Sequence, residues 1–139
     1  MPIPPAARWL GFAGLLPFLA AAAAAVLADG ALQGFAARAL PAYGAVILSF
    51  LGGIRWGLAM AAAEPGRLPA RLAVSVVPSL AGWVALLLPG AAGLALLAAG
   101  FAAMLALDLR DASAPAWYAK LRLPLSLGAI AALVVGLAA

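Results

Sequence analysis

The chain contains five apolar runs, each long enough to cross a lipid bilayer as a helix, with a short break after each of the first four. The first run, at 9–28, would make about 30 Å of helix, which is the thickness of the hydrocarbon core. The pattern therefore predicts an all-α fold, an integral membrane bundle of five transmembrane helices in a single domain, 1–139. The expected spans are 9–28, 40–63, 72–88, 91–109 and 121–138.

The composition indicates that lipid is the solvent for most of the chain. Hydrophobic residues make up 68% and charged residues 9%, whereas a soluble domain carries about 25% charged residues. The sequence has no cysteine and no histidine, which removes disulfides, Cys/His zinc sites, thiol chemistry, His-ligated haem and histidine as a general base. We therefore expect no metal, no cofactor, no catalytic residues and no enzymatic activity.

Apart from Arg55, the basic residues lie in the loops or near the ends of the apolar runs, so the net charge of +4 indicates membrane topology and no nucleic-acid partner. If the chain crosses the membrane five times, only Arg38 lies on one side of the membrane. The other side carries Arg8, Arg67, Arg71, Arg110, Lys120 and Arg122. Because cytoplasmic loops are enriched in lysine and arginine, this bias predicts a cytoplasmic N-terminus and an external C-terminus.

Prolines and glycines predict the breaks and bends. Pro17 predicts a kink in the first span that frees the carbonyl of Ala13. Residues 29–39 are expected to form a polar link, and Pro89-Gly90 a tight turn that makes the third and fourth spans an antiparallel hairpin. Residues 26–28 also fit a signal-peptide cleavage site, but we expect the first span to be retained.

An arginine, Arg55, lies well inside the second apolar run, where a charge needs a partner or a polar cavity. Asp108, at the end of the fourth run, is the one acid within any of the five runs. The helical rise places the two about 10 Å apart along the membrane normal, a gap that a long side chain, with or without one water, can bridge. We expect an Arg55–Asp108 ion pair. The alternatives are an arginine that reaches the interface alone or one that faces a polar cavity. Further ligand or ion-pair candidates in the same stretch are Tyr43, Ser49 and Trp56.

Small residues recur every four positions on two of the runs, a spacing that lets another helix approach closely. The second run has Ser49, Gly53 and Gly57, and the last has Gly128, Ala132 and Gly136. We expect these residues to pack helices within the bundle, and the alternative is a seam between copies of the chain.

Aromatic and basic residues gather just before the last run, at Trp117, Tyr118, Lys120 and Arg122. We expect an interfacial belt there. The alternative is a ligand lip in which Lys120 and Arg122 meet an anionic headgroup.

Two segments together resemble a known family. They read YGAVILSFLGGIRWG at 43–57 and WYAKLRLPLS at 117–126, with Asp108 between them. Over nearly its whole length the chain resembles the bacterial family called domain of unknown function 3429, whose eukaryotic relatives are called transmembrane protein 69 and are associated with mitochondria. The resemblance implies the five-helix fold and no particular activity. That family usually has histidine at the position of Arg55. An arginine at this position can still donate hydrogen bonds as a cation, but it cannot act as a metal ligand or a titratable imidazole.

We therefore expect a small, non-catalytic, multi-pass protein of the bacterial inner membrane that contacts membrane lipids and binds a lipid, a hydrophobic ligand or a partner membrane protein. The alternative is a small oligomeric transporter or channel with Arg55 lining a polar path. Facing polar groups on two or three helices would favour transport, and a dry core with one ion pair would favour a structural or binding role.

Overall fold

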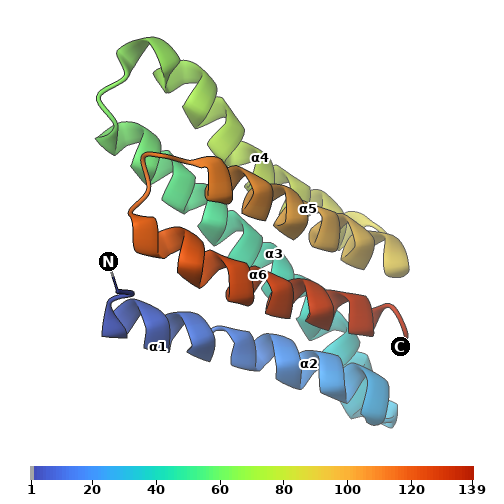
Figure 1. The fold of residues 1–139 in the computed structure, drawn as a ribbon. Helices are drawn as coiled ribbons and strands as arrows, with labels where there is room; N and C mark the ends of the chain where they lie inside the picture. Colours follow the sequence, from blue (N-terminus) through green and yellow to red (C-terminus); the bar gives the residue numbers. More distant parts are fainter. Residues whose placement is uncertain (1) are drawn as a thin grey trace.

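The computed structural model describes residues 2–139, and within them the chain is a bundle of helices without strands (Figure 1). Five helical segments are long and apolar enough to cross a membrane, which confirms the predicted number of spans. The elements are α1 (Pro5–Ala13), α2 (Leu15–Leu27), α3 (Gly30–Ala61), the 3₁₀ turn η1 (Pro65–Arg67), α4 (Leu68–Leu87), α5 (Ala91–Arg110) and α6 (Ala116–Gly136).

The five spans form a closed ring, in which α2 packs on α3, α3 on α4, α4 on α5, α5 on α6, and α6 back on α2. The long helix α3 also contacts α5 and α6, so it touches every other span. The core of the ring is apolar, and its most deeply buried members include Phe18, Leu48, Leu97, Phe101 and Leu133.

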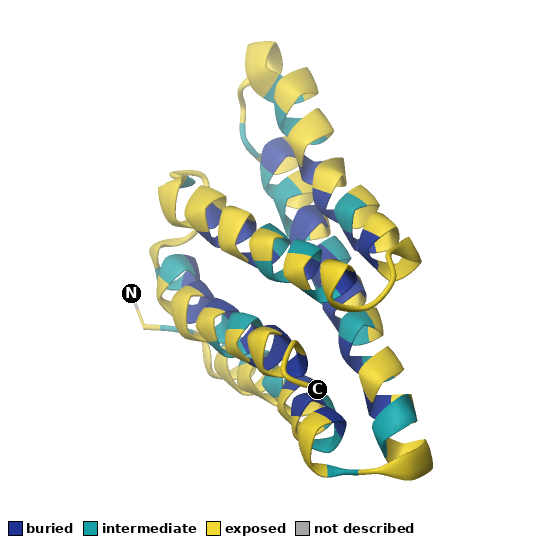
Figure 2. Cartoon of the chain, turned by 90° about the vertical axis from the view of Figure 1, so that its right-hand side faces the viewer, coloured by how far each residue is buried: buried dark blue, intermediate teal, exposed yellow. Residues whose placement is uncertain are grey.

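Large apolar side chains cover the outside of the bundle, where Leu10 is 75% and Leu27 83% exposed. Figure 2 shows buried segments on the facing sides of the helices and exposed residues on the outward sides. A continuous apolar surface of this kind is unstable in water and stable against lipid chains.

The helix of the first span is interrupted at Gly14, three residues before Pro17, and this separates α1 from α2. Pro17 has no N–H to donate to the carbonyl of Ala13, the group that the sequence predicts to be freed. The hydroxyl of Tyr43 in α3 donates instead to the next carbonyl, that of Gly14, at 2.7 Å. The Tyr43 ring also meets Phe18 edge-on, with 4.8 Å between centroids.

The predicted boundaries differ from the structure most at the starts of the second and last spans. Residues 29–39 do not form a link, because α3 begins at Gly30, whose φ of +59° makes the corner after α2. The first turns of α3 bury Ala36 and Leu40, one helical turn apart, and this apolar face extends the helix beyond the predicted span. The last helix likewise begins at Ala116, before residue 121. The predicted α4–α5 hairpin turn is confirmed, with Gly90 at φ +58°.

The glycines that pack helices together are only partly the predicted ones. Gly128 lies against Leu15, and Gly136 against Leu40 and Leu94, as predicted. The prediction that Gly53 and Gly57 pack helices within the bundle is wrong. Both face outward, and a Cβ atom added at either one would have no side chain or neighbouring helix of the described residues within 4 Å. Their neighbour Gly52 has this role, since a Cβ there would lie 2.5 Å from the backbone oxygen of Ser75 in α4.

Candidate functional site

Asp108 near the end of α5 is the centre of a buried ion cluster. Its side chain is fully buried, and each carboxylate oxygen accepts a hydrogen bond from a different helix. Arg55 Nη1 of α3 donates to Oδ1 at 3.0 Å, and Arg122 Nε of α6 donates to Oδ2 at 2.9 Å. The predicted Arg55–Asp108 pair is therefore confirmed as a direct contact.

The expected offset of about 10 Å between the two residues does not arise, because the helix ends are not level. Figure 1 shows that the α3–α4 corner extends beyond the α5–α6 loop. Gly44 of α3 lies against the side chain of Leu97 in α5, and Arg55 and Asp108 are each eleven residues further along these two helices. Arg55 therefore lies beside the end of α5 although it is well inside α3, and the contact needs no bridging water.

A second carboxylate, Asp111 in the α5–α6 loop, extends the cluster. Its Oδ2 lies 3.5 Å from Arg55 Nη1 and 3.6 Å from Arg71 Nη2 of α4. Ser113 donates to Oδ1 through its backbone N–H at 2.9 Å and through its hydroxyl, which in turn accepts from Arg71 at 2.8 Å. The cluster thus connects α3, α4, α5 and α6 at one end of the bundle.

The pKa of Asp111 reflects these partners. Burial alone would raise the pKa, but the hydrogen bonds from Ser113 and the positive charges of Arg55 and Arg71 outweigh it. The pKa of the Asp111 carboxyl therefore lies below its ordinary value, and the group is ionised at neutral pH.

The other predicted site residues lie in different places. Trp56 is 42% exposed on the outer surface, Ser49 is half-buried away from the cluster, and Tyr43 bonds to the kink in the first span. Lys120 is exposed and Trp117 half-buried. The prediction that Tyr118 and Arg122 lie at the membrane interface is wrong. Both side chains point from α6 into the bundle, and the two residues are only 8% and 4% exposed.

Sequence reasoning did not assign Arg71, Asp111 and Ser113 to this site. A signal was present for the two charged residues: Arg71 was expected on the side of the membrane where the fourth run ends, and Asp111 follows Asp108 by three residues. Which charged residues pair with one another depends on how the ends of the helices are arranged. The hydropathy of the sequence carries no information about that arrangement.

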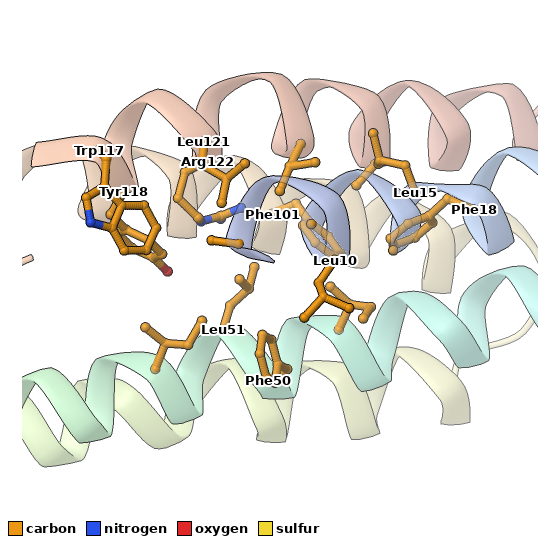
Figure 3. Close-up of a pocket in the computed structure, with 17 residues that line it drawn as sticks. Leu10, Leu15, Phe18, Phe50, Leu51, Phe101, Trp117, Tyr118, Leu121 and Arg122 are labelled. Carbon is orange, nitrogen blue, oxygen red and sulfur yellow. The ribbon is translucent and has the colours of Figure 1, made fainter. Parts of the chain in front are cut away.

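A cavity of about 380 Å³ lies beside the cluster (Figure 3). It is bounded by α1, α2, α3 and α6, with Phe101 of α5 among its walls. The walls are almost wholly apolar, and their aromatic members are Phe18, Phe50, Phe101, Trp117 and Tyr118. Arg122 is the one charged residue among the 17 that line it in the described chain.

The cavity has a mouth that faces the membrane. Within residues 2–139, α1 packs on α2 and α6 but not on α3, so the pocket separates α1 from α3. Leu10 of α1 and Phe50 of α3 line the pocket and are 75% and 63% exposed. A ligand could therefore enter sideways from the lipid.

Residues 2–139 hold no group of three or more Asp or Glu side chains that could bind a metal ion. The arrangement offers a buried ion cluster and an apolar pocket that share Arg122.

Five spanning helices, an apolar exterior and a charge cluster closed within the bundle define a multi-pass helical membrane protein. Comparison with known families supports this class. The chain belongs to the family described as Protein of unknown function (DUF3429), whose model matches residues 3–138.

Two vertebrate relatives are called Transmembrane protein 69. The protein of Xenopus tropicalis is 39% identical over 136 residues, which cover 94% of this chain and 53% of that protein. The protein of Mus musculus is 38% identical over 85 residues, which cover 60% of this chain and 34% of that protein. The chain thus spans about half the length of the frog relative. No solved structure matches the chain.

Proposed function

We propose that this protein is a non-catalytic membrane protein that binds a hydrophobic ligand taken sideways from the bilayer. The observation that carries the proposal is the 380 Å³ apolar pocket with a mouth between α1 and α3. Ligand pockets are typically apolar and about 300–1,000 Å³. A volume near the lower end suits one acyl chain rather than a two-chain lipid.

The proposal includes the inner membrane of a bacterium, with the N-terminus in the cytoplasm. The support is the strong excess of lysine and arginine on one side of the five spans. The ion cluster would then lie in the cytoplasmic half of the bundle, where it fixes the helices that form the pocket walls.

A transporter or channel with Arg55 lining a polar path is the less favoured function. The guanidinium of Arg55 contacts two carboxylates, those of Asp108 and Asp111, and its side chain is 14% exposed. Arg55 is not among the residues that line the pocket. This arrangement resembles a structural ion pair more than a conduction path.

Native mass spectrometry with added hexadecanol tests the proposal. Leu125 of α6 lines the pocket, so we expect Leu125→Trp to fill it and remove the bound alcohol. Leu123 lies two residues away, is 44% exposed and does not line the pocket, so Leu123→Trp is the matched control. We expect the control to retain one bound alcohol per chain. Equal binding by both variants would contradict the proposal.

A further inference from the structure

The polar end of the pocket indicates what its ligand must carry. We infer that the ligand is a single-chain amphiphile with an anionic head, a carboxylate or a phosphate, whose head lies against Tyr118 and Arg122. This inference rests on the proposed function, because it names the ligand class of the same pocket.

Tyr118 and Arg122 are four residues apart on α6 and therefore share one face of the helix. Figure 3 shows both side chains on the same side of the pocket, with Phe18 and Leu15 toward the opposite end. Both residues are more than nine-tenths buried and line the pocket. An amphiphile with its head at this end would lay its chain along the apolar walls toward Phe18.

Each of the two side chains has a donor without a partner. The Tyr118 hydroxyl and Arg122 Nη2 are buried, and neither makes a hydrogen bond of normal length and angle within residues 2–139, although the two side chains are neighbours. Buried donors are nearly always satisfied in folded proteins because an unmade hydrogen bond is costly. A small accepting group at this end of the pocket could satisfy both donors at once.

The charge of the cluster favours an anion over a neutral acceptor. Three arginines meet two carboxylates, which leaves one positive charge in excess. The Nε of Arg122 donates to Asp108, which orients the guanidinium and leaves Nη2 for the ligand. A head with one negative charge would balance the cluster in a low-dielectric site, where charge complementarity matters most.

The test is isothermal titration calorimetry at pH 8 in a non-ionic detergent. The probes share one chain length: palmitate, hexadecyl phosphate and hexadecanol. We expect at least one of the two anions to bind about 10-fold more tightly than the alcohol, from a charge-assisted hydrogen bond. Tighter binding of palmitate would identify a carboxylate head, and tighter binding of hexadecyl phosphate a phosphate head.

Three variants distinguish specific binding at Tyr118 and Arg122 from nonspecific attraction of the anions to a basic protein. Tyr118→Phe removes one hydroxyl and leaves the Arg122–Asp108 pair intact, so we expect it to fold and to weaken the preferred anion several-fold. Arg122→Lys keeps the charge but loses Nη2, and should also weaken it. Lys120→Gln removes an exposed cation of the same helix and should change nothing.

The inference would be overturned if both anions bound no more tightly than the alcohol, or if Tyr118→Phe had no effect. If all three probes bound equally and Leu125→Trp abolished their binding, the proposed hydrophobic pocket would be supported and the anionic head group would be ruled out. If no probe bound, both the proposed function and this inference would be contradicted.

Discussion

Arg55 and Arg122 hold the two oxygens of a single carboxylate, that of Asp108, from helices that lie on different sides of it. One buried charge thereby connects α3, α5 and α6. Removing the carboxylate would leave two arginines in a low-dielectric site, whereas removing either arginine leaves the other pair in place. The consequences of substitution should therefore be unequal.

We expect Asp108→Asn to destabilise the bundle more than Arg55→Gln does. Breaking a buried pair from one side typically costs about 3–5 kcal/mol, and Asp108 has two buried partners. Thermal unfolding in detergent would measure the order of the two variants. A larger loss in Arg55→Gln would show that Asp111 matters more to Arg55 than Asp108 does.

The double variant of Arg55→Gln with Asp108→Asn should recover only part of the loss. The two sites contact each other, so their effects should not add. Recovery should be incomplete because Arg122 remains without Asp108. Strictly additive unfolding free energies would contradict the coupling.

Two adjacent glycines make a matched pair. Gly52→Ala should lower thermal stability, because its Cβ would meet the backbone oxygen of Ser75 and force α3 and α4 apart. Gly53→Ala adds the same methyl group where no other described element lies within 4 Å, so it should be neutral or slightly stabilising. If Gly53→Ala were the damaging change, Gly53 would pack against another molecule, as an oligomer seam requires.

The lowered pKa of Asp111 predicts acid sensitivity at the α5–α6 loop. A carboxyl whose folded pKa is below its ordinary value of 3.8 adds stability above that pH and loses it as the pH falls through the folded value. Asp111→Asn should therefore be less stable than the natural protein at pH 6, and the difference should shrink toward pH 3. Melting temperatures of both proteins across this range would show it. A constant difference would contradict the argument.

Orientation can be tested with single cysteines, since the natural sequence has none. We expect Gly66→Cys and Ala112→Cys to be protected from a membrane-impermeant maleimide added outside intact cells. Asp29→Cys, in the corner between α2 and α3, should react. The reverse pattern would place the N-terminus outside the cell.

Tyr43→Phe should destabilise the joint between the first span and α3. The substitution removes the hydroxyl that donates to Gly14 at 2.7 Å and keeps the ring against Phe18. The expected loss is about 1 kcal/mol, from one hydrogen bond in an apolar setting. Unfolding measurements that give no change would indicate that the Gly14 carbonyl finds another donor.

The number of spans, the hairpin at Gly90 and the need of Arg55 for a partner could all be predicted from the sequence. Each depends on local quantities: the length of an apolar run, the turn-forming pair Pro89-Gly90 and the cost of a charge in lipid. The Arg55–Asp108 pair was also accessible, because Asp108 was the one acid available to an arginine within the apolar runs.

Tertiary structure alone decided which face of each helix points inward and how far each helix end extends. Small residues occupy both positions 52 and 53, and the rotation of α3 selects Gly52 for packing. The rotation of α6 turns Tyr118 and Arg122 inward, away from the interface expected for them. The register of α3 against α5, in which Gly44 lies against Leu97, brings Arg55 into direct contact with Asp108. Hydropathy reports depth in the membrane, but rotation and offset depend on packing between helices, and these created the pocket and its polar end.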